Sequence, residues 1–197
     1  MGNARQDTRK LALLALFTAI VAVLQMLGIV VRFGVFAVSM VGVPIIIGGA
    51  LMGPLAGAWL GLVFGVTVLL SGDAALFLAW NPAATIAIVL LKGTLAGLAA
   101  GGIYRLVEIK NSFLAVLAAA VVFPAVNTGV FFLGCMLFLL DDCVKFAAEN
   151  GFVASGPVVL VSFYIGFNFF FELGLDLVLS GVVDRLIRVG QKTLKKT

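Results

Sequence analysis

Three ionisable residues inside long apolar segments are the first candidates for chemistry. Lys92 lies in one apolar stretch, and Glu172 and Asp176 lie in another. A charged side chain in hydrocarbon is costly, and it usually faces a partner, a substrate or a water-filled cavity. Two interpretations follow: these groups bind a ligand, or Lys92 pairs with one of the acids as a structural ion pair.

The last apolar stretch carries a polar residue at every fourth position. This spacing places the polar residues on a single helix face. The residues are Tyr164, Asn168, Glu172 and Asp176. The deeper Asp176 is expected to be structural, because it approaches the far side of the membrane.

Two other stretches add polar groups at a comparable depth. Asn81 and Lys92 share a helix face, and Asn127 follows Pro124, whose ring frees a backbone carbonyl one turn earlier. With a rise of about 1.5 Å per residue, Lys92 and Asn127 fall at a depth similar to that of Asn168. The pattern predicts a polar pocket formed by three helices and entered from outside.

The candidate set also includes residues at the mouth of this pocket. Arg32 and Trp80 flank the outer end, although Trp80 serves equally well as an interfacial anchor. The amides of Asn127 and Asn168 could instead form hydrogen bonds between helices, each of which contributes about 0.6–2 kcal/mol to stability. The predicted substrate-binding residues are Arg32, Trp80, Asn81, Lys92, Asn127, Tyr164, Asn168 and Glu172.

Composition sets the environment of these groups. Of the 197 residues, 63% are hydrophobic and 11% are charged, which is far too apolar for a soluble domain of this size. The chain has no histidine, which removes the commonest general base and metal ligand. We therefore expect an integral membrane protein with no catalytic residue, no metal, no cofactor and no nucleic-acid partner.

The apolar stretches predict an all-α membrane protein of one domain, residues 1–197, with six transmembrane helices. An apolar loop is expected near 71–81 and a polar loop near 141–151. The expected spans are about 11–31, 38–52, 54–71, 82–104, 113–140 and 157–183.

Positive charge predicts the orientation. Ten of the 13 Lys and Arg residues lie at the termini or in the 104–111 connector, and the other three are Arg32, Lys92 and Lys145. The positive-inside rule then places both termini in the cytoplasm. The ten are Arg5, Arg9, Lys10, Arg105, Lys110, Arg185, Arg188, Lys192, Lys195 and Lys196.

A glycine ladder, defined as Gly53, Gly57, Gly61 and Gly65, marks the third span. Small residues at this spacing form a smooth stripe on which another helix packs closely. We interpret the ladder as a packing surface beside the pocket rather than as a ligand site.

In the order and spacing of its small-residue motifs, the chain resembles the substrate-binding S component of energy-coupling factor (ECF) vitamin transporters. The resemblance covers residues from about 9 to 188. The motifs are Ala15-x-x-x-Ala19, Pro44-Ile-Ile-Ile-Gly48, the glycine ladder and Lys92-Gly93 to Gly97.

The resemblance implies a six-helix protein of the bacterial cell membrane that binds a water-soluble vitamin near the outer face. It implies partners: a transmembrane coupling subunit and two ATPase subunits, with Ala15 and Ala19 in the docking face. The cations Lys92 and Arg32 favour an anionic vitamin such as pantothenate, while the aromatic mouth keeps riboflavin and folate-like ligands open.

Two other functions compete with this one. Glu172 and Asp176 would serve as proton carriers in a stand-alone, ion-coupled secondary transporter. An intramembrane enzyme, such as a lipid-head-group transferase, is disfavoured because these two acids form the only candidate cluster in the sequence.

Overall fold

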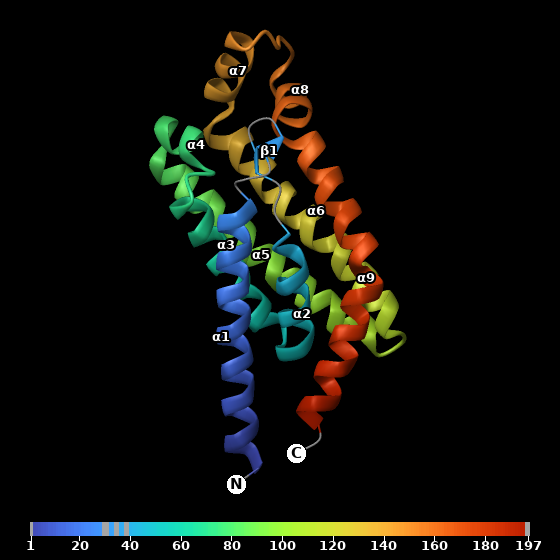
Figure 1. Cartoon of the computed structure of the whole chain (residues 1–197). Helices are drawn as coiled ribbons and strands as arrows, with labels where there is room; N and C mark the ends of the chain where they lie inside the picture. Colours follow the sequence, from blue (N-terminus) through green and yellow to red (C-terminus); the bar gives the residue numbers. More distant parts are fainter. Residues whose placement is uncertain (1, 29–31, 34–35, 38–39, 196–197) are drawn as a thin grey trace.

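Helices make up almost all of the structure, a computed structural model that describes residues 2–28, 32–33, 36–37 and 40–195 (Figure 1). Two short strands, β1 (Arg32–Phe33) and β2 (Phe36–Ala37), pair antiparallel between α1 and α2. The helices are α1 (Gly2–Gly28), α2 (Gly42–Met52), α3 (Pro54–Leu70), α4 (Ala75–Trp80), α5 (Pro82–Glu108), α6 (Ser112–Phe138), α7 (Leu140–Glu149), α8 (Gly156–Val159), the π-helix η1 (Leu160–Ile165) and α9 (Gly166–Lys195).

Several helices are suited to a membrane. Within the described residues, α1 from Thr8, α5 and α6 are each long and apolar enough to cross it. A fourth candidate span consists of Gly156–Ile165 and Asn168–Leu194, which meet at a bend of 47°. The apolar helices α2 and α3 are shorter. The expected all-helical membrane architecture is thereby confirmed.

Proline, glycine and asparagine set the helix boundaries. Gly53, with φ of 107°, separates α2 from α3, and Pro54 occupies the first turn of α3. Asn81 starts α5 because its side chain accepts a hydrogen bond from the Ala84 amide at 3.1 Å. Asn111 caps α6 in the same way.

Both loops expected between spans contain a short helix, which the sequence analysis did not anticipate. Residues 75–80 form α4, whose sequence Ala-Leu-Phe-Leu-Ala-Trp has no helix breaker. Residues 140–149 form the amphipathic α7, with Asp141 and Asp142 in its first turn, where acids favour the helix dipole. α2 begins at Gly42, four residues later than expected for its span.

The glycine ladder packs directly on α5. A Cβ added at Gly57 would meet the Gly97 carbonyl oxygen at under 3.0 Å, and one at Gly61 would meet that of Gly93. The reverse additions, at Gly93 and Gly97, meet the carbonyls of Gly61 and Gly57. The interpretation of the ladder as a packing surface is confirmed, because the two backbones touch along this line.

Two apolar clusters fill the bundle. The larger one joins α1, α2, α3, α5, α6 and α9, and the smaller one lies among α4, α5, α6, α7 and the η1 segment. In Figure 1 the smaller cluster's helices α4 and α7 lie at the end opposite both chain termini.

Close to the termini, a polar network joins α6 to α9. Ser112 Oγ donates a 2.6 Å hydrogen bond to Asp184 Oδ1, and Arg188 Nη2 lies 2.8 Å from Asp184 Oδ2. Both contacts stabilise the ionised form of the Asp184 carboxylate.

Candidate functional site

A small polar cavity lies where α5, α6 and the η1–α9 segment meet. Its volume is about 30 Å³, enough for one or two water molecules. Four of the predicted site residues line it, together with three that were not in the predicted set. The lining residues are Lys92, Asn127, Thr128, Phe131, Tyr164, Ile165 and Asn168.

Lys92 is held at this cavity by aromatic rings. Its Nζ lies 5.0 Å from the Phe131 ring centroid and 5.8 Å from that of Phe64. Glu172 and Lys92 attract each other electrostatically, yet no salt bridge within 4.0 Å joins Lys92 to Glu172 or Asp176 among the described residues. The direct ion pair that competed with ligand binding is therefore not formed in this structure.

Glu172 and Asn127 present unpaired hydrogen-bond acceptors. Asn168 Nδ2 donates to Glu172 Oε1 at 3.3 Å, which leaves Glu172 Oε2 without a partner among the described residues. Asn127 Oδ1 is also unpartnered there. Because these residues are only 8% and 5% exposed, each bare acceptor carries a substantial desolvation cost. A ligand that donates hydrogen bonds would remove that cost.

The η1 segment positions Tyr164 and Ile165 on the cavity. π-Helical turns are rare and often occur at functional sites, because they re-aim side chains relative to a regular helix. Tyr164 OH donates a 3.1 Å hydrogen bond to the Cys143 carbonyl oxygen, which ties η1 to α7. The hydroxyl of Tyr164 thus fixes a residue that lines the cavity.

An aromatic cluster covers the same region. Phe77 contacts Trp80, Phe131 and Tyr164, with ring centroids 5.3–5.8 Å apart. Trp80 in turn packs on Phe146 of α7. Together these rings join α4 and α7 above the cavity.

Three other predicted residues, Glu172, Asn81 and Trp80, are not among those that line the cavity. Asn81 is the N-cap of α5 and borders a separate apolar hollow between α5 and α6. Trp80 belongs to the aromatic cluster. The side chain of Arg32 lies outside the described part of the structure, so its predicted role at the mouth stays a prediction.

Asp176 contacts the start of α2 instead of the cavity. A Cβ added at Gly42 would meet Asp176 Oδ2 at 2.7 Å and Oδ1 at 2.9 Å. Gly42 is the first residue of α2, where a carboxylate interacts favourably with the helix dipole. This contact gives Asp176 a structural partner.

The sequence pattern pointed to polar lining residues and passed over apolar ones. Phe131 lies four residues after Asn127, on the same helix face, and that spacing was the available signal. Thr128 and Ile165 directly follow the predicted positions Asn127 and Tyr164.

The predicted docking residues lie on α1. Ala15 and Ala19 are exposed there, whereas Thr18 accepts a 3.1 Å hydrogen bond from Trp59 Nε1 of α3.

Comparisons with known proteins agree with this picture. Among solved structures, ThiT from Listeria monocytogenes superposes with a TM-score of 0.66 at 17% sequence identity, over 95% of this chain and 98% of that chain. At that identity the likeness concerns the fold alone. A sequence comparison with curated proteins gives no match.

A family model decides the assignment. The model described as "ECF transporter, substrate-specific component" matches residues 9–183, which confirms the resemblance drawn from the small-residue motifs. The chain therefore belongs to the substrate-specific components of ECF transporters, which are membrane-embedded binding proteins for transport and not enzymes.

Proposed function

We propose that this protein binds a water-soluble vitamin, or a related micronutrient, over the polar cluster of Lys92, Asn127 and Glu172. The observation that carries the proposal is the pair of buried acceptors, Asn127 Oδ1 and Glu172 Oε2, that have no partner among the described residues. They come from two helices and lie in the region of a lysine held between aromatic rings. Substrate sites are built in this way, from a few convergent polar groups within apolar walls.

Lys92 at the cavity and the unpartnered acceptors of Asn127 and Glu172 suggest which chemical groups the ligand carries. The Lys92 ammonium favours a carboxylate or a phosphate, and the bare acceptors favour hydroxyl or amide donors. Pantothenate combines a carboxylate with hydroxyl and amide groups, which makes it the first ligand to test. Riboflavin and folate-like compounds are the second group, because the rings of Phe77, Trp80 and Phe131 offer stacking surfaces.

Binding must widen the site. A drug-sized ligand needs a pocket of roughly 300–1,000 Å³, far more than the present cavity of about 30 Å³. The aromatic cluster has to separate for this to occur, and α4 is the short element that carries Phe77 and Trp80. We propose that Arg32 and Trp80, the residues predicted at the mouth of the pocket, lie at this entrance.

Ligand titration monitored by tryptophan fluorescence tests the assignment, because Trp80 belongs to the aromatic cluster. We expect an anionic vitamin to bind and the variant Lys92→Met to bind it about 10- to 100-fold more weakly, as for loss of one charge-assisted hydrogen bond. Lys145→Met, at an exposed position of α7, is the matched control.

Two results would contradict this assignment. Unchanged affinity in Lys92→Met would remove that residue from the site. A failure to bind any of a vitamin panel, with no small molecule released from the purified protein on denaturation, would count against the function as a whole.

We further infer a six-span topology in the bacterial cell membrane, with both termini in the cytoplasm. The bias of Lys and Arg toward the termini and the 104–111 connector supports it. The direct test is the labelling of cysteines introduced as Lys110→Cys and Lys145→Cys. These two positions fall on opposite sides of the membrane in this topology. Labelling of both positions from the same side would overturn it.

The inferred partners are a transmembrane coupling subunit and two ATPase subunits, which dock against Ala15 and Ala19. Both alanines are exposed on α1, so larger side chains there would block close helix contact. We expect the double variant Ala15→Leu/Ala19→Leu to lose co-purification with the module and to keep vitamin binding. Ala87→Leu, at an exposed position of α5, should retain both properties.

The alternative function is ion-coupled transport by the chain alone. Glu172 and Asp176 are buried one helical turn apart on α9, as proton-carrying groups would be. Uptake into liposomes that contain only this chain, driven by a proton or sodium gradient, would favour the alternative. Uptake that requires added ATPases favours the S component.

A further inference from the structure

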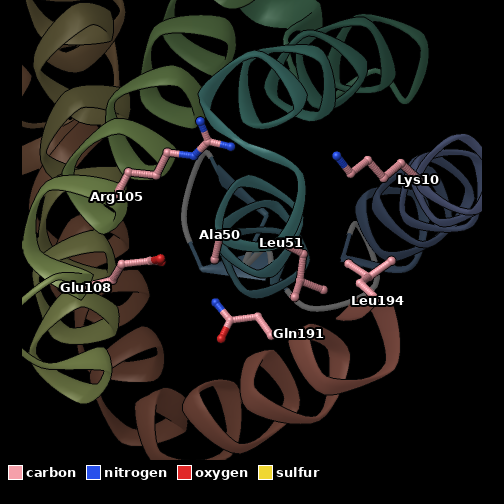
Figure 2. Close-up of a pocket in the computed structure, with 7 residues that line it drawn as sticks. All are labelled: Lys10, Ala50, Leu51, Arg105, Glu108, Gln191 and Leu194. Atoms are coloured by element: carbon pink, nitrogen blue, oxygen red, sulfur yellow. The ribbon is translucent and has the colours of Figure 1, made fainter. Parts of the chain in front are cut away.

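A second, larger cavity lies among α1, α2, α5 and α9, apart from the candidate vitamin site. Its volume is about 490 Å³, and it shares no lining residue with the polar cavity of Lys92. Figure 2 shows Lys10 of α1 and Arg105 of α5 on opposite sides of this cavity, with Glu108 on the same side as Arg105 and Gln191 projecting from α9. Two cations and one acid give its lining a net charge of +1.

Both cations sit where apolar helices end. Lys10 directly precedes the apolar run that starts at Leu11, and Arg105 lies in the last turn of α5. Lysine and arginine at such boundaries lie at the level of the lipid headgroups. The cavity therefore opens at the height where phosphate groups of a bilayer are found.

Lys10 also borders an apolar groove, of about 410 Å³, between α1 and α3. Leu14 of α1 and Leu55 and Trp59 of α3 line that groove. A cationic cavity joined to an apolar groove through one lysine fits an amphiphile that has a charged head and a hydrocarbon tail. A soluble anion would use the cavity and leave the groove unused.

We propose that this cavity binds the phosphate group of an anionic phospholipid. Lys10 and Arg105 hold the phosphate, and an acyl chain lies in the groove along Leu14 and Trp59. A phosphodiester with one negative charge balances the net charge of the lining. Basic pockets between transmembrane helices are known to bind such headgroups.

The guanidinium of Arg105 is placed for this role by the break between α2 and α3. The Arg105 guanidinium lies directly against Gly53, since a Cβ added there would meet it at under 3.0 Å. Glu108, one turn further along α5, opposes an anionic ligand. Replacement of Glu108 by the neutral glutamine is therefore expected to strengthen binding, whereas loss of either cation is expected to weaken it.

The experiment measures lipid retention by native mass spectrometry on the delipidated full-length protein, titrated with phosphatidylglycerol or phosphatidylcholine. We expect a preference for phosphatidylglycerol, weakened about five-fold in Lys10→Gln and in Arg105→Gln, as for loss of one cation near the headgroups. Glu108→Gln should bind more tightly. Lys110→Gln, which makes the same charge change at an exposed position outside the cavity, should match the unmodified chain.

Three outcomes would overturn the proposal. Equal retention of the two lipids, or an equal loss in Lys110→Gln and Lys10→Gln, would reduce the effect to general surface charge. Full displacement of phosphatidylglycerol by millimolar inorganic phosphate would assign the cations to a soluble phosphate compound. If Arg105→Gln fails to fold because it loses its contact at Gly53, the exposed Lys10 decides the question.

Discussion

Replacement of Gly61 by alanine tests the close contact between α3 and α5. A Cβ at this position meets the carbonyl oxygen and carbon of Gly93 at under 3.0 Å, and the Thr94 amide nitrogen at 3.2 Å. All three atoms belong to the backbone, so no side chain can turn aside to make room. The two helices must separate locally.

The expected magnitude follows from a comparison with Gly102→Ala. Gly102 is on α5, and a Cβ added there meets nothing within 4 Å. Alanine is favoured over glycine inside a helix by about 1 kcal/mol at both positions, so this term cancels between the variants. The remaining difference is the overpacking cost, about 1–3 kcal/mol, which lowers the stability of Gly61→Ala.

Thermal or denaturant unfolding of the two variants in the same detergent measures the difference. We expect Gly102→Ala to match or exceed the unmodified chain and Gly61→Ala to fall below it. Equal stability of the two variants would refute the backbone contact, because it would mean that a methyl group fits between the helices.

Three further predictions concern other contacts. Asp184→Asn should lose about 1.5–3 kcal/mol in unfolding measurements near neutral pH, since two hydrogen bonds to a carboxylate are weakened. Unchanged stability of this variant would argue against the network with Ser112 and Arg188. Gly42→Ala should destabilise the fold in thermal unfolding, because its methyl group would displace the Asp176 carboxylate, and equal stability would argue against that contact. Tyr164→Phe removes the side-chain donor to the Cys143 carbonyl and should cost about 1 kcal/mol in the same assay, with faster proteolysis within α7.

The sequence was most informative where one residue type has one physical consequence. Pro54, Pro82 and Gly53 mark helix boundaries because their backbone preferences are local. The four-residue spacing of glycines predicted that another helix packs closely on α3, because small residues permit close approach of any partner helix, and the structure identifies that helix as α5.

Other features depend on contacts that are distant in the sequence. For Phe131 the four-residue spacing from Asn127 was the one sequence signal, and it did not single the residue out, because an aromatic side chain among apolar neighbours is usually part of the core. The η1 turn and α7 stabilise each other through Tyr164 and Cys143, which are 21 residues apart. The bare acceptors of Asn127 and Glu172 are visible only when the packing around them is known.

Because the backbones of α3 and α5 touch, this helix pair can serve as a rigid reference against which the motion of other helices is measured. Two helices whose carbonyls meet the opposing glycines cannot slide past each other without collision, so the pair moves as one body. Spin labels at the exposed positions Leu95 and Leu98 of α5 would therefore keep fixed distances to α3. Distances from them to labels on α4 or α9 would then report the displacement of those helices alone.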